Sequence, residues 1–294
     1  MQKITPFLWF DKEAAEAAEL YTTIFKDSKI TNATTLRDTP SGDTEIISVD
    51  LMGQDFSLMS AGPPFKFTPA ISFLVVLNKR DEVTAAWECL SEGGSALMEL
   101  DTYPFSELFG WVQDKYNLSW QLMLVGDREV AQAITPTLMF VGERCGQAEE
   151  ASNFYASVFH DAKIGDVLRY GADEEPETKG TIKHVGFTLE GQEFAAKDSA
   201  REHDFTFNEA ISFVVNCKSQ KEIDYYWEKL SAVPEAEQCG WLKDQFGVSW
   251  QIVPVDMETM MQEGDPLQLA RVKQAVLPMK KFDLKVLRQA YEGE

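Results

Sequence analysis

The chain has 294 residues, of which 44% are hydrophobic and 26% charged, and its formal net charge is −21. This length suits two domains, and the composition is that of a folded soluble protein rather than a fibrous or disordered chain. Because so negative a field repels phosphate groups and no basic patch offsets it, the sequence argues against nucleic-acid and membrane partners.

The first half of the chain begins with a predicted strand at residues 4–10, which is followed by an amphipathic helix. Ala14, Ala18 and Tyr21 share the apolar face of that helix, as expected of a helix that lies on a sheet. Strands follow, and then a buried strand at residues 71–76, a second helix and further strands. Apolar residues recur every second position, as in strands, then about every 3.6 positions, as in a helix, and then every second position again. This change occurs twice, which predicts two βαβββ units.

The same motifs return in the second half of the chain in the same order. The matched pairs of segments are residues 4–10 and 134–140, 53–56 and 191–194, 70–73 and 210–213, and 110–121 and 240–251. Chance does not preserve so many ordered matches, so the sequence predicts a tandem repeat.

We therefore expect an α+β fold with tandem domains at residues 1–126 and 127–256. Each domain should contain two βαβββ units, which form curved mixed or antiparallel sheets with helices on one face. Residues 257–294 are predicted to form a helical tail of two short helices, broken at Pro278, that packs on the second domain.

The four cysteines are widely spaced and form no C-x-x-C pair, which is typical of free thiols in a reducing compartment. The N-terminal residues lack the apolar core of a signal peptide. No apolar stretch approaches the roughly 20 residues that span a bilayer. These observations predict a cytoplasmic protein.

The repeated motifs resemble the PhnB-like branch of the vicinal-oxygen-chelate superfamily, which includes glyoxalase, bleomycin-resistance and dioxygenase proteins. The resemblance rests on I-T-P-x-L-x-F at residues 134–140, on the Gly-Trp to Trp-Gln stretch at residues 240–251 and on residues 207–213 and 278–281. It covers almost the whole chain. The second copy is closer to the family pattern, whereas the first is degenerate at residues 68–69 and 117–118.

This resemblance implies three positions for divalent-metal ligands in each copy. They fall near Thr5, Ala70 and Gln121 in the first copy and near Thr135, Ala210 and Gln251 in the second. A lone neutral amide offers too little charge to hold such an ion. We therefore expect neither a metal site nor a cofactor, with a divalent metal in the second copy as the alternative.

The same branch often carries the label 3-demethylubiquinone-9 3-methyltransferase. A nucleotide-type methyl donor usually needs a glycine-rich turn between a strand and a helix, where the backbone can approach the ligand closely. The sequence contains no G-x-G, which disfavours methyl transfer.

Candidate catalytic residues are confined to the second copy. His184 occupies a strand position where the branch often has histidine, whereas the first copy has Ile46 there. Together with Glu209 and Asp198, His184 could form an acid–base pair or a makeshift metal site. The alternative is a strand histidine with only a structural hydrogen bond.

Candidate ligand-binding residues flank the last strand of each copy. They are Trp111, Trp120, Gln121, Trp241, Trp250 and Gln251. The tryptophans suit either an aromatic cavity wall or the core, and the glutamines suit either polar contacts to a ligand or pairing with buried backbone.

The leading hypothesis is a protein that binds a small apolar or aromatic molecule without the usual metal. The alternative is a lyase, isomerase or dioxygenase-type enzyme with its site in the second copy. A third reading, a purely structural domain, predicts cavities filled by their own side chains. Because single-domain relatives resemble subunits of shared dimers, we expect either an intrachain pseudo-dimer or a homodimer.

Overall fold

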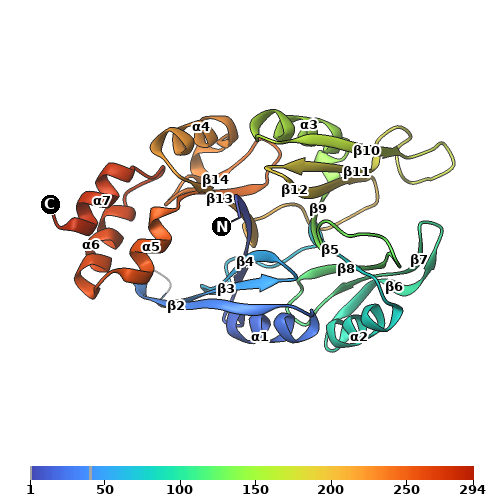
Figure 1. Ribbon diagram of the computed structural model, residues 1–294. Helices are drawn as coiled ribbons and strands as arrows, with labels where there is room; N and C mark the ends of the chain where they lie inside the picture. Colours follow the sequence, from blue (N-terminus) through green and yellow to red (C-terminus); the bar gives the residue numbers. More distant parts are fainter. Residues whose placement is uncertain (1, 40–41) are drawn as a thin grey trace. The chain divides into compact units, whose positions relative to one another are not determined.

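The computed structural model describes residues 2–39 and 42–294, and its elements follow the repeat that the sequence predicts (Figure 1). The elements of the first copy are β1 (Ile4–Phe10), α1 (Ala14–Ile24), β2 (Lys29–Thr39), β3 (Gly42–Leu51), β4 (Gln54–Ser60), β5 (Ile71–Leu77), α2 (Arg80–Ser91), β6 (Ser95–Tyr103), β7 (Ser106–Gln113) and β8 (Ser119–Leu124). Those of the second are β9 (Ile134–Val141), α3 (Ala148–Val158), β10 (Lys163–Arg169), β11 (Ile182–Leu189), β12 (Gln192–Ser199), β13 (Ile211–Cys217), α4 (Gln220–Leu230), β14 (Trp241–Lys243) and β15 (Ser249–Pro254). The expected α+β fold is confirmed.

Backbone contacts divide the chain into two units. The central unit comprises residues 8–211, and the terminal unit comprises residues 2–7 and 212–294. The domain bounds that the repeat suggests, at residues 126 and 256, stay a prediction.

An eight-stranded sheet in the order β10-β11-β12-β9-β5-β8-β7-β6 forms most of the central unit. At its middle β5 and β9 run antiparallel, with Ile71 opposite Leu138. Since β5–β8 belong to the first copy and β9–β12 to the second, this sheet joins the second half of one copy to the first half of the other. Helix α2 packs on β7 and β8, and α3 packs on β11 and β12.

Six of the remaining strands form two smaller groups, one in each unit. In the central unit, β2, β3 and β4 form an antiparallel group on which α1 packs. In the terminal unit, β13 pairs parallel with β15, which pairs antiparallel with β14. Helix α4 packs on β15 and begins after Ser219, whose side chain accepts a hydrogen bond from the Glu222 N–H.

The fourth unit of the repeat is shorter than expected, because only two strands follow α4 in place of the predicted three. Gly110 follows Leu90 by 20 residues, whereas Gly240 follows Leu230 by only 10. The shorter segment leaves no room for a counterpart of β6. It forms instead a 3₁₀ turn at Pro234–Ala236.

The tail contains three helices rather than the predicted two, namely α5 (Asp256–Glu263), α6 (Pro266–Val276) and α7 (Leu284–Glu292). Only Met260 is buried in α5, so its apolar periodicity is too weak to show in the sequence. Backbone bonds hold the tail to the turn before β14, since the N–H groups of Cys239 and Gly240 donate to the carbonyls of Met279 and Lys280 at 2.8 and 2.7 Å. No helix in the described part of the chain is long and apolar enough to span a membrane.

Gly110 in β7 packs directly under the indole of Trp87 in α2. A Cβ atom at position 110 would lie 2.5 Å from Cζ3 of that ring, a distance at which one group must move. We expect Gly110→Ala to lower the free energy of unfolding by about 1–3 kcal/mol through overpacking, as measured by denaturant titration. Combining it with Trp87→Leu should recover part of the loss, and strictly additive losses would contradict this explanation.

Candidate functional site

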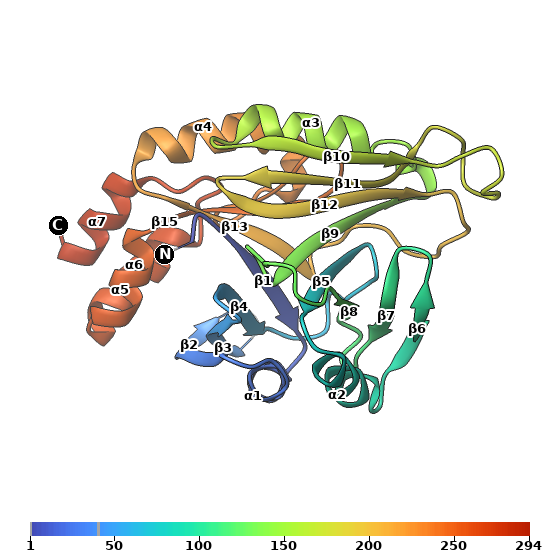
Figure 2. The same ribbon diagram turned by 45° about the vertical axis from the view of Figure 1, so that its right-hand side comes forward.

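The eight-stranded sheet curls strongly enough to bring its two halves face to face (Figure 2). Three strands separate β7 from β12, which would place them roughly 19 Å apart in a flat sheet at about 4.8 Å per strand. Yet Nζ of Lys197 on β12 lies 5.4 Å from the ring centroid of Trp111 on β7. The surface on which these side chains meet, opposite α2 and α3, is called the concave face below.

The strand register assigns side chains from both copies to this concave face. Trp111 lies opposite Gln121, and Gln121 lies opposite Leu74. In the other half, Met139 lies opposite Lys197. Since directly paired residues point to the same side of a sheet, these residues share one surface.

An apolar cluster covers much of the concave face. Its buried members are Phe109, Trp111, Met139 and Val141, and the half-buried side chains Leu74, Met98, Tyr103, Met123 and Phe205 pack against them. Three of these residues are methionines, whose flexible thioethers adapt to ligands of different shape. The cluster gives the concave face an adaptable apolar floor.

Two side chains of the first copy on the concave face also form hydrogen bonds. The indole N–H of Trp111 donates to Oγ of Ser119 at 2.7 Å, which fixes the ring in place. The amide of Gln121 donates to Oγ of Ser72 at 2.7 Å. Within residues 2–39 and 42–294 nothing donates to its amide oxygen, which is therefore open to a ligand.

Lys197 is the feature that sequence reasoning missed. Its side chain is half-buried, and among the described residues its ammonium group forms neither a hydrogen bond nor an ion pair. Burial lowers its pKa. The charge of Glu177 opposes this shift and that of Arg201 adds to it, both more weakly than burial. The available signal was one lysine directly after the apolar run Phe194-Ala195-Ala196 in the middle of β12.

His184 lies on the same face as Lys197, because Val185 pairs with Ala196 on the opposite face and side chains alternate along each strand. Its side chain is exposed at the rim. Desolvation by the surrounding protein and the neighbouring Lys197 charge lower the pKa of His184. Both effects favour the neutral imidazole, which can donate one hydrogen bond and accept another.

The structure does not bring Asp198 to His184. Asp198 follows Lys197 and so points to the helix side of the sheet. There its carboxylate accepts the N–H groups of Gly146, Ala148 and Ile182 at 2.8, 3.1 and 2.8 Å. Glu209 is half-buried in the turn before β13. An acid–base pair of His184 with Asp198 would require both side chains to leave these positions.

Trp120 and Trp250 lie in the core rather than in a cavity. Trp120 is fully buried against Tyr21, Phe25 and Phe73. Its indole donates to Asp114 at 3.0 Å, as that of Trp250 does to Asp244 at 2.8 Å in the terminal unit.

The terminal unit repeats the arrangement of Trp111 and Gln121. Trp241 lies opposite Gln251, and the amide of Gln251 donates to Oγ of Ser212 at 3.0 Å. In both copies a tryptophan therefore lies opposite the glutamine of the last strand, and that glutamine donates to a serine on the adjacent strand. The cavity role of Trp241 and Gln251 stays a prediction.

The concave face does not fit the divalent metal that the resemblance implies. Thr135 and Gln121 supply only a hydroxyl and a neutral amide, and the Lys197 ammonium on the same face repels a cation. Among the described residues, no group of three or more histidine, cysteine or acidic side chains is placed to hold a metal ion.

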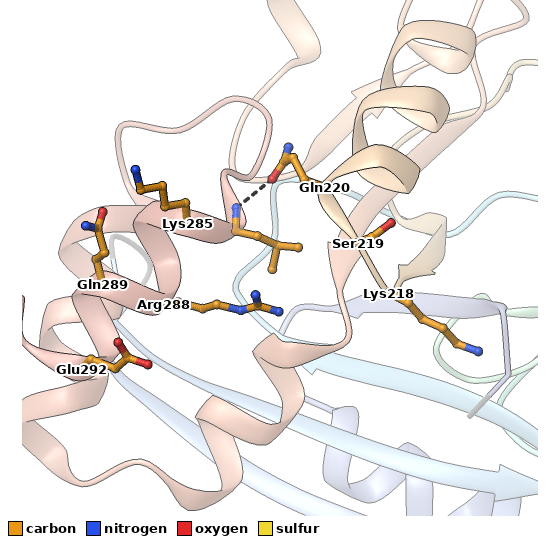
Figure 3. Close-up of a pocket in the computed structure, with 8 residues that line it drawn as sticks. Lys218, Ser219, Gln220, Lys285, Arg288, Gln289 and Glu292 are labelled. Atoms are coloured by element: carbon orange, nitrogen blue, oxygen red, sulfur yellow. Dashed lines mark hydrogen bonds between the residues drawn. The ribbon is translucent and has the colours of Figure 1, made fainter.

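A hollow of about 460 Å³ lies in the terminal unit (Figure 3). It is lined by Lys218, Ser219, Gln220, Leu284, Lys285, Arg288, Gln289 and Glu292. Arg288 is already paired with Asp256 at 2.7 Å, and the Gln220 side chain accepts the N–H of Leu284 at 2.8 Å. Its two exposed lysines make it a useful comparison for any test with anions.

The curled sheets and their outer helices define a fold of the glyoxalase type. The chain is similar to glyoxalase I from Zea mays at 12% identity, with a TM-score of 0.53 over 88% of this chain and 96% of the maize chain. It is also similar to a protein from Bacillus subtilis assigned as a dioxygenase, at 13% identity and a TM-score of 0.50 over 95% and 97% of the two chains.

Sequence comparison places the chain within one family. The profile of the 3-demethylubiquinone-9 3-methyltransferase family matches residues 2–123 and again residues 132–253, so the chain belongs to this family and contains two copies of its domain. A PhnB protein from Bacillus cereus that carries the same family description is 37% identical, over 42% of this chain and 100% of that chain, with a TM-score of 0.40. None of the curated proteins matches the chain in sequence.

Proposed function

We propose that the protein binds a small planar or apolar molecule on the concave face of its eight-stranded sheet, in the cytoplasm and without a metal ion. The observation that carries the proposal is the contact of Lys197 with Trp111, 5.4 Å above the ring centroid. The aromatic ring of Trp111, the charged donor of Lys197 and the flexible methionine side chains of the apolar cluster thus share one curved surface. Such a mixture of mostly apolar lining with few polar groups is typical of ligand sites.

The family name suggests methyl transfer, but the chain lacks the glycine-rich turn that a nucleotide-type methyl donor usually needs. The enzymatic alternative also stays a prediction. It would require His184 to act without Asp198, whose carboxylate is engaged on the other side of the sheet.

The proposal predicts that Trp111 dominates binding. We expect Trp111→Leu to weaken the binding of neutral planar probes such as indole by about tenfold or more, because stacking on a tryptophan contributes about 1–3 kcal/mol. Titration calorimetry is the appropriate measurement, since it does not depend on which tryptophan reports. Trp87→Leu is the matched control, because Trp87 lies on α2, outside the concave face.

Equal affinity of indole for the wild type and for Trp111→Leu would contradict the location of the site. A wild type that binds no planar probe at millimolar concentration would contradict the proposed function itself.

A further inference from the structure

We infer that the ligand of the concave face carries one negative charge beside its apolar body, and that the Lys197 ammonium binds this charge. The inference rests on the proposed function and adds the chemical class of the ligand, a planar monoanion such as an aromatic carboxylate.

The first step of the argument is that the Lys197 charge lacks a partner. An ammonium group has three N–H donors, and among the described residues that of Lys197 has no hydrogen-bond or ion-pair partner and lies over the face of Trp111. A half-buried charge without a counter-charge is costly, and a ligand anion would remove that cost. The structure thus holds a donor ready for an acceptor that the protein does not supply.

The second step is that the nearest acid is already engaged. The Glu177 carboxylate, 7% exposed, accepts hydrogen bonds from Ser199 Oγ at 3.1 Å and from the Ala200 N–H at 2.6 Å. It also pairs with Arg201 at 3.2 Å. Glu177 therefore moderates the field at Lys197 without forming an ion pair with it, and the positive charge that it balances is that of Arg201.

The third step concerns the number of negative charges on the ligand. The concave face offers one ammonium, and its neighbour His184 has its pKa lowered, so it contributes a neutral N–H donor. One cation with one neutral donor matches a carboxylate, whereas a phosphate dianion would need a second cation. The ring of Trp111 beneath the ammonium and the methionine floor then favour a planar body attached to that carboxylate.

The test uses pairs of probes that share a ring and differ only in charge. Indole-3-carboxylate and indole-3-carboxamide form one pair, and the corresponding benzene and naphthalene compounds form two more. For the wild type we expect the carboxylate to bind about tenfold more tightly than the carboxamide in titration calorimetry, as a charged hydrogen bond allows. In Lys197→Met this preference should vanish while carboxamide binding is retained, and Lys197→Arg should keep part of the preference.

Two control variants separate a specific contact from general charge. Lys183→Met removes an exposed cation from the neighbouring strand, where it pairs with Glu174, and it should leave the preference unchanged. Lys285→Met removes a lysine of the hollow in Figure 3 and should do the same. If Lys285→Met abolished the preference and Lys197→Met did not, the anion would bind in that hollow and the inference would be wrong.

The remaining outcomes distinguish the inference from the function beneath it. Equal affinities of each carboxylate and its carboxamide, with both weakened by Trp111→Leu, would contradict the negative charge of the ligand. They would still support the proposed binding site. Failure of all three pairs to bind the wild type would overturn the proposed function as well.

Discussion

Replacing Asp114 with alanine is expected to lower the free energy of unfolding by about 3–4 kcal/mol, the largest stability effect we predict. Asp114 is 2% exposed, and its carboxylate accepts the Tyr21 hydroxyl at 2.6 Å and the Trp120 indole N–H at 3.0 Å. It also accepts the backbone N–H groups of Tyr116 and Leu118 at 2.9 and 3.0 Å.

Alanine would leave these four donors without an acceptor in a place that water does not reach, and each unsatisfied donor costs free energy. Burial raises the pKa of Asp114, while the bonds from Tyr21 and Trp120 oppose that rise. Denaturant titration followed by tryptophan fluorescence measures the effect. Asp101→Ala, at an exposed position of β6, is the control, and a loss at Asp114 no larger than that at Asp101 would contradict the argument.

Replacing Asp198 with alanine should lower the free energy of unfolding by about 2–3 kcal/mol, because its carboxylate accepts three backbone N–H groups where α3 and β11 begin. Asparagine should cost less, since its oxygen still accepts the bonds of Gly146 and Ala148. Neither variant should change the affinity for planar probes, because Asp198 lies on the helix side of the sheet.

The same pair of measurements tests the catalytic role that the sequence suggests for Asp198. Chemical denaturation gives the stability, and calorimetry gives the affinity. A variant that loses probe binding while its stability stays that of the wild type would show that Asp198 acts at the ligand site, contrary to the geometry described above.

Local features of the fold could be predicted because each depends on residues close together in sequence. Apolar periodicity indicates α1 and its partners, and Ser219 indicates the start of α4. The missing strand of the fourth unit was not predicted, although the ten-residue gap between Leu230 and Gly240 contained the necessary signal. The pairing of β5 with β9 could not be predicted, because the alternation of β5 suits several partners equally well.

The position of each candidate site residue depends on such long-range pairing. Trp111 and Gln121 were identified from the repeat and lie on one face. The sequence favours Asp198 over Lys197 as a site residue, since a shift of one residue along β12 decides which side chain lies on the concave face, and the register of a strand is not visible in its sequence. Trp120 was grouped with Trp111 for lack of the same information.

The sheet that joins the two copies has a consequence for the evolution of the gene. Under the proposed function, selection for ligand binding would act jointly on residues 71–124 and residues 134–199, which come from different copies and share one sheet. Among related sequences, the residues at positions 111 and 197 should therefore co-vary. A recombination event that exchanged the second repeat for that of a relative would separate that pair, even though it preserved the reading frame.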